Sequence, residues 1–122
     1  MSIITSTIVL IFLYTVQLNA QYGHACGFAG TTLPIREEVE TLIHEKNQLQ
    51  LTEWLYSNDK LKQVYGAEAL IRLHNAGTGL SKNQLRKIIE LKNSEIEIMT
   101  CSGCIMSTQT MKSALFKYRL KE

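Results

Sequence analysis

The sequence predicts a small all-α domain of about five helices, with a short extended segment before a CxxC loop and an export signal ahead of the domain. Two observations support this fold class. Apolar residues recur at helical spacing through most of the chain after residue 33, and the period changes to two over residues 95–100. We therefore expect one helical domain over residues 34–122.

Residues 1–20 have the composition of a cleavable signal peptide. Ile3 to Val16 is apolar except for Thr and Ser, the first charged side chain is Arg36, and the small Ala20 stands at the expected cleavage site. As a helix, Ile3 to Leu18 would span about 24 Å, short of the ~30 Å hydrocarbon core of a bilayer. We expect a secreted or periplasmic protein that contacts the membrane only through an uncleaved signal segment.

The charge balance argues against nucleic acid as a partner. The chain has 13 Lys and Arg against 11 Asp and Glu, and no basic run is interleaved with aromatic residues. About 102 residues would remain after cleavage, enough for a single core. A protein partner of unknown identity is the expectation that remains.

The first two helices are expected after a flexible leader over residues 21–33, which holds three Gly and no charge. Pro34 suits a first helical turn and begins a helix predicted over residues 34–46. A shorter apolar face over residues 49–55 predicts the second helix, which ends at the turn-forming residues 57–59.

The third helix should form the centre of the fold. Residues 60–76 carry too many apolar positions for one stripe, so this helix should be buried on more than one side. Gly77 fits a left-handed cap at its end. Ser81 and Gln84 form the pattern of a capping box and begin a fourth helix that ends near Asn93.

The last part of the chain is predicted to contain a lone strand and an amphipathic helix. Residues 95–100 alternate in polarity, but no partner strand is apparent. Residues 108–120 return to helical spacing, and basic side chains gather toward their end. This helix is expected to be amphipathic and basic, and the sequence leaves open whether it lies on the core or on a membrane surface.

Residues 49–76 resemble a HEAT-type repeat, the helix–turn–helix unit of α-solenoids. The resemblance rests on Trp54-Leu55, the turn at residues 57–59, Val64, the run Ala67-Glu68-Ala69-Leu70 and Leu73. Tyr65 stands where that family usually has arginine. The resemblance implies one repeat-like hairpin in a domain that binds protein. The alternative is an ordinary helical hairpin whose small alanines let two helices approach closely.

Cys101 and Cys104 form the one short motif with chemical content, and three interpretations remain open. In an exported protein the pair is expected to form a structural disulfide. Alternatives are a redox-active pair, although no βαβ pattern precedes the motif, and a zinc site completed by His24 and Cys26. Cys26 is otherwise expected to be a free or intermolecular thiol.

No catalytic constellation is apparent. HExxH, GxSxG and CxxCH motifs are all missing, and the acidic residues of the first helix are spaced as a solvated face. We therefore expect a non-enzymatic protein-interaction module with no catalytic residue, no cofactor and no resident metal. Its candidate partner contacts are Trp54, Tyr65, Lys117 and Arg119. The alternative is a thiol/disulfide redox or zinc-binding protein that uses the CxxC.

Overall fold

The protein is mostly helical, with two small antiparallel sheets at one end. The computed structural model describes residues 21–26, 31–102 and 105–121. Its helices are α2 (Pro34–His44), α3 (Gln48–Leu55), α4 (Lys60–Asn75), α5 (Lys82–Lys92) and α6 (Met111–Leu115). Its strands are β1 (Ala25–Cys26), β2 (Thr31–Thr32), β3 (Glu97–Ser102) and β4 (Ile105–Thr110). The helical prediction is confirmed, whereas the purely all-α assignment is wrong.

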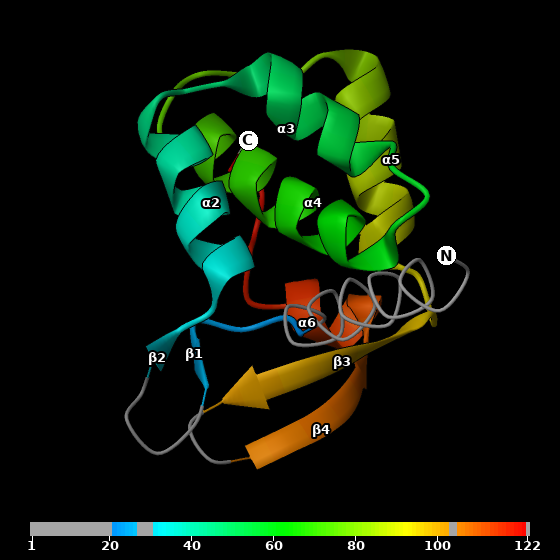
Figure 1. The fold of residues 1–122 in the computed structure, drawn as a ribbon. Coiled ribbons are helices and arrows are strands. Elements are labelled where there is room, and N and C mark those ends of the chain that lie inside the picture. The colour runs from blue at the N-terminus through cyan, green and yellow to red at the C-terminus, as the bar shows by residue number, and fades with distance from the viewer. Residues whose placement is uncertain (1–20, 27–30, 103–104, 122) are drawn as a thin grey trace, which may run out of the picture.

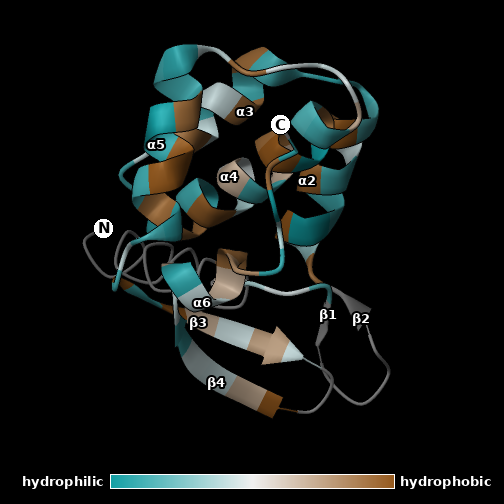
Figure 2. Ribbon diagram, turned by 180° about the vertical axis from the view of Figure 1, so that it is seen from behind, coloured by the Kyte–Doolittle hydropathy of each residue, from teal (hydrophilic) through white to brown (hydrophobic). Residues whose placement is uncertain are grey.

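Helix α4 is the centre of the core, as its sequence predicts. Every residue from 64 to 70 is buried, so this helix is covered all round. It packs against α2, α3, α5 and α6, and Figures 1 and 2 show it enclosed between α2, α3 and α5. The strands and α6 lie beyond one end of this helical layer.

Gly66 allows α3 and α4 to pack with their backbones close together. A Cβ atom at this position would lie 2.9 Å from Leu55 N, 3.0 Å from Trp54 Cβ and 3.1 Å from Leu51 O. Those separations leave no room for a methyl group, so glycine is the residue that this crossing requires. The alternative of an ordinary helical hairpin attributed the close approach of these two helices to alanines. The structure shows that Gly66, next to those alanines, allows it.

The helix boundaries follow the expected capping chemistry. Ser81 and Gln84 form the predicted capping box, with both reciprocal hydrogen bonds present. Asp59 caps α4 by accepting a hydrogen bond from Leu61 N. Gly77 follows α4 with φ of 106°, in the left-handed region where glycine is favoured.

The extended segment pairs with residues that were assigned in part to the last helix. β3 and β4 form an antiparallel hairpin with Glu97 opposite Thr110 and Ser102 opposite Ile105. Because Thr110 caps α6 by accepting a hydrogen bond from Ser113 N, the helix begins only after β4. The final helix is therefore five residues long rather than the thirteen expected over residues 108–120.

The residues after α6 run back along α4 without regular structure. Asn75 fixes this segment through two hydrogen bonds, from its Nδ2 to Arg119 O (2.7 Å) and from Lys121 N to its Oδ1 (2.9 Å). Lys92 Nζ also donates to Leu115 O at 3.1 Å. The basic residues near the end of the chain therefore do not form the helical face that was predicted.

The leader expected to be flexible is anchored to the core at Tyr22 and Leu33. Tyr22 is buried, and its backbone forms a parallel bridge with Thr100 of β3. Leu33, at the other end of this segment, is also buried. The expectation overlooked the aromatic side chain, which the core can accept. Residues 27–30, and the proposed signal peptide over residues 1–20, lie outside the described residues.

None of the helices in the described part of the chain is both long and apolar enough to span a bilayer.

Candidate functional site

A buried ion pair lies where the N-terminal segment, α2 and α4 meet. Glu68 of α4 is fully buried and Arg36 of α2 is 2% exposed. The guanidinium binds the carboxylate through two hydrogen bonds, Nη1 to Oε2 at 2.6 Å and Nη2 to Oε1 at 2.9 Å. This bidentate geometry gives the strongest form of arginine–carboxylate contact.

Two tyrosines and the N-terminal backbone complete the shell of this ion pair. The Tyr22 hydroxyl donates to Glu68 Oε1, and Arg36 Nε donates to Gly23 O at 2.9 Å. The guanidinium carbon of Arg36 lies 4.8 Å from the centre of the Tyr65 ring. Tyr65 in turn donates its hydroxyl to Gln21 O at 2.8 Å. The network therefore fastens residues 21–23 to the helical core.

A second, half-exposed pair extends the network toward solvent. Arg72 donates to both oxygens of Glu40, at 2.6 Å and 3.0 Å. Arg72 Nη1 also lies 3.1 Å from Glu68 Oε2, and Arg36 Nη1 lies 3.1 Å from Glu40 Oε1. Two arginines and two glutamates thus neutralise one another, so the network leaves no net charge.

The pKa directions agree with a permanently ionised network. Burial opposes the charged form of Glu68, but the hydrogen bonds and charge of Arg36 outweigh it and hold the pKa of Glu68 below its usual range. Hydrogen bonds from Arg72 lower the pKa of Glu40. Burial raises the pKa of Tyr65 to about 12, and burial together with Glu68 raises that of Tyr22. Both tyrosines stay protonated, so none of these groups is poised as a base near neutral pH.

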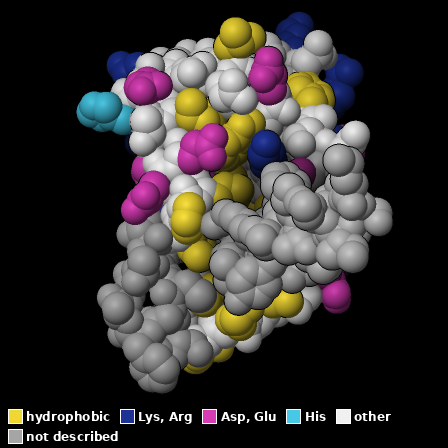
Figure 3. All heavy atoms as spheres, in the orientation of Figure 1, with side chains coloured by type: hydrophobic (Ala, Val, Ile, Leu, Met, Phe, Trp, Pro, Cys, Tyr) yellow, Lys and Arg dark blue, Asp and Glu magenta, His cyan; other side chains and the backbone are white. Residues whose placement is uncertain are grey.

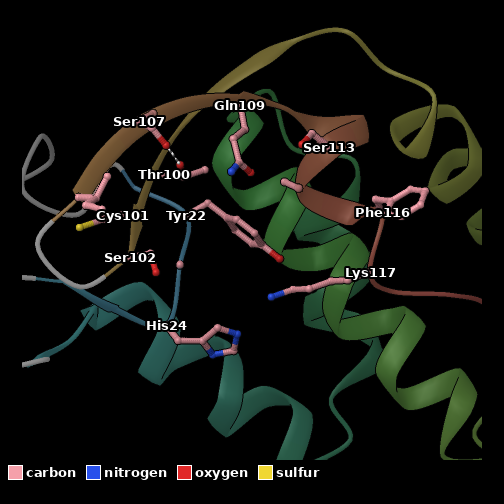
Figure 4. A pocket seen from close by; sticks show the side chains of 13 residues that line it. Tyr22, His24, Thr100, Cys101, Ser102, Ser107, Gln109, Ser113, Phe116 and Lys117 are labelled. Carbon is pink, nitrogen blue, oxygen red and sulfur yellow. Dashed lines mark hydrogen bonds between the residues drawn. The ribbon is translucent and has the colours of Figure 1, made fainter.

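A cleft of about 580 Å³ lies beside this network, between the β3–β4 hairpin, residues 22–24 and the segment that begins with α6. Tyr22 forms part of its wall, and the described residues of the lining include no acidic side chain. Figure 4 shows Gln109, Lys117 and His24 pointing into the same space from different sides. Burial, followed by the charge of Arg36, lowers the pKa of His24. The cleft therefore presents neutral hydrogen-bonding groups and one lysine.

The structure separates the residues predicted to contact a partner. Trp54 is 3% exposed and Tyr65 is fully buried, so neither side chain offers a contact surface. Lys117 and Arg119 are exposed, and both lie after α6. Arg36 and Glu68 were not among the residues predicted from the sequence. Glu68 carried a signal, because a glutamate on a helix predicted to be buried on more than one side needs a buried cation.

Cys101 is buried and takes part in a disulfide bond. The side chains of Cys26 and Cys104 lie outside the described residues, so the predicted pairing of Cys101 with Cys104 stays a prediction. The zinc alternative draws on the same two side chains and on His24. Within the described residues no group of three or more potential ligands is close enough to hold a metal ion.

No family model, curated protein or solved structure matches the chain. The HEAT-like resemblance of residues 49–76 therefore stays a prediction.

Proposed function

We propose that the protein is an exported, non-enzymatic interaction module whose protein partner adds an extended strand to the outer edge of β4. The observation that carries the proposal is the exposure of this strand. In Figure 1, β4 lies at the outside of the molecule with β3 between it and the helices. Residues 105–109 are all exposed, and Thr110 is half-buried.

The backbone geometry supports this edge as a hydrogen-bonding surface. Met99 O accepts a hydrogen bond from Tyr22 N at 2.8 Å, and Cys101 N donates to Tyr22 O at 3.0 Å. The backbone groups of Met99 and Cys101 therefore point away from β4. Their cross-strand neighbours are Thr108 and Met106, whose N–H and C=O groups must point away from β3 in an antiparallel ladder. These four groups face the outer edge.

The side chains of β4 also leave its edge open. Exposed edge strands are usually protected by charged residues, proline or a bulge. The strand Ile105-Met106-Ser107-Thr108-Gln109-Thr110 contains no charge and no proline. Ile105 is 71% exposed and Met106 is 54% exposed. An extended, uncharged segment with apolar side chains fits such an edge by strand addition.

Other surfaces support this function less well. On the face that Figure 3 shows, in the orientation of Figure 1, hydrophobic side chains of the described residues are interleaved with acidic and basic ones. The redox alternative requires an accessible sulfur, whereas Cys101 is 2% exposed.

Export and the absence of catalysis remain parts of the proposal. An amino terminus at Gln21 in the protein from its native compartment would support export.

The test is site-specific photo-crosslinking from Met106 in the native compartment. A crosslinker at Leu49, which is 78% exposed on α3, is the control for non-specific capture. We expect one adduct of defined mass from position 106 and none from position 49. Thr108→Pro removes an outward N–H without breaking the β3–β4 ladder and should abolish the adduct, whereas Thr108→Ala keeps the N–H and should preserve it.

A folded Thr108→Pro protein that still gives the adduct would overturn the proposal, as would the lack of any adduct from position 106. Circular dichroism of each variant establishes that it is folded. If proline unfolds the hairpin, Thr108→Lys takes its place, because it keeps the backbone groups but puts a charge on the edge.

A further inference from the structure

We infer that the cleft between the β3–β4 hairpin and α6 binds a carboxylate group, with Lys117 as its cation and Gln109 and Ser113 as neutral donors. The cleft lies on the face of β4 that carries Ile105, Ser107 and Gln109, whereas the proposed function uses the outward backbone groups of Met106 and Thr108, so this inference goes beyond the proposed function. The ligand is defined by its chemistry, a single carboxylate with an apolar substituent.

The cleft is formed by three parts of the chain that are distant in sequence. Residues 22–24, the hairpin and the segment over residues 113–117 enclose about 580 Å³, within the usual size range of small-ligand sites. The floor is fixed, because Tyr22 is held by Glu68 and Gly23 is held by Arg36 and Tyr65. A ligand would therefore meet a preformed wall, which lowers the entropic cost of binding.

Three side chains that line the cleft have hydrogen-bonding capacity to spare, although Lys117 Nζ lies 5.2 Å from the centre of the Tyr118 ring. In the described part of the chain, the side chains of Gln109, Ser113 and Lys117 form no hydrogen bond and no ion pair. Ser107 differs, since its hydroxyl lies 2.9 Å from Thr100 Oγ1. Figure 4 shows Gln109 and Lys117 directed into the cleft from two sides, with Ser113 on the wall between them.

The charge of the cleft selects a monoanion. None of the described residues that line it is an aspartate or glutamate, and the nearby Arg36 is neutralised by Glu68. His24 is uncharged near neutral pH, because burial and the nearby Arg36 lower its pKa. Among the described residues that line the cleft, Lys117 is then the one charge without an ion-pair partner. One lysine with neutral donors matches a carboxylate, whereas a phosphate dianion is usually bound by arginine forks or several cations.

Apolar side chains stand next to these donors. Ile105 is 71% exposed and Phe116 is 72% exposed, and both contribute to the lining of the cleft. Both side chains line the same cleft, so they place apolar surface beside its hydrogen-bonding groups. They would cover the apolar substituent of a bound carboxylate while Lys117 binds its charged end.

The test is two-dimensional NMR titration of the isotope-labelled protein with its disulfide intact. The probes are 3-phenylpropanoate, its uncharged amide, inorganic phosphate, and a capped tetrapeptide that ends in a free phenylalanine carboxylate. We expect 3-phenylpropanoate or the peptide to shift the amide signals of Gln109, Ser113 and Lys117, and the amide analogue to have little effect. The tighter of the two carboxylates identifies a small molecule or a chain terminus as the source.

Substitutions on the same segment provide matched variants. Lys117→Gln should weaken carboxylate binding by about tenfold, as expected for one charge-assisted hydrogen bond. Lys112→Gln removes an exposed lysine that lies outside the cleft and should leave binding unchanged. Equal binding of the amide, equal binding of phosphate, an equal effect of both variants, or no shift at millimolar concentration would each overturn the inference.

Discussion

At the scale of single residues, one buried ion pair connects the beginning of the described chain to its centre. Glu68 has no exposed surface and satisfies its oxygens with Arg36, Tyr22 and Arg72. A buried ion pair does not by itself make a protein more stable, because desolvation offsets its attraction. Its loss is nevertheless costly, since removal of one partner leaves the other charge buried without compensation.

Glu68→Gln should therefore destabilise the protein strongly. The change leaves the buried Arg36 guanidinium without its main counter-charge, and we expect the free energy of unfolding to fall by about 3–5 kcal/mol. Urea denaturation at neutral pH measures this change. Glu90→Gln is the control, because that carboxylate is 66% exposed and should alter stability by less than ~0.5 kcal/mol. Equal effects of the two substitutions would contradict the account.

The lowered pKa values of the same carboxylates make the free energy of unfolding depend on pH. The pKa values of Glu68 and Glu40 are lowered in the folded protein, so the unfolded chain binds more protons as pH falls below about 4.3. Their stabilisation is present above that pH and is lost as pH falls through the folded pKa values. Urea midpoints should decline below about pH 5, and less steeply in Glu68→Gln than in the wild type. Parallel declines would show that Glu68 is not the responsible group.

At the scale of elements, local patterns identified the helices and failed at the hairpin. The capping box at Ser81 and the cap at Gly77 are local signals, and both were predicted correctly. β4 lacks such a signal, because Ile105 to Thr110 does not alternate between a polar and a buried face. Its strand state follows from pairing with β3, which is information that a sequence window does not contain.

Substitution of Gly66 at the α3–α4 crossing has two opposing effects on stability, a gain in helix propensity and a steric clash. Gly66→Ala improves the helix propensity of α4 by about 1 kcal/mol, but the new methyl group would contact the backbone of α3 at 2.9–3.1 Å. We expect the clash to dominate and to lower the free energy of unfolding by about 1–3 kcal/mol. Thermal and urea denaturation measure the balance. A more stable variant would mean that the two helices can separate without loss.

At the scale of the whole molecule, the sequence predicted the helices α2 to α6 of the described residues, but not how residues 21–23 and the residues after α6 are held. Helical periodicity reports which face of a segment is apolar, and this was enough to place α4 at the centre. Tyr22 stands in a glycine-rich segment without periodicity, so its burial against Tyr65 was not predictable. The cleft could not be predicted either, since its walls come from both ends of the chain.

The packed N-terminal segment also determines which edge of the hairpin is open. Tyr22 pairs with β3 on the side opposite to β4, so one edge of the sheet is occupied by the chain itself. The outer edge of β4 is then where a partner strand can pair, and this assignment is the central claim about function. It depends on two amides, those of Met106 and Thr108, pointing away from β3.

Hydrogen–deuterium exchange of those two amides tests the claim most directly. The isotope-labelled protein is measured alone and then mixed with the unlabelled proteins of its native compartment. We predict that the Met106 and Thr108 amides exchange rapidly in the protein alone and at least about tenfold more slowly in the mixture, while exchange in α5 is unchanged. Protection of these amides in the isolated protein, or a complex that forms without slowing them, would contradict the account.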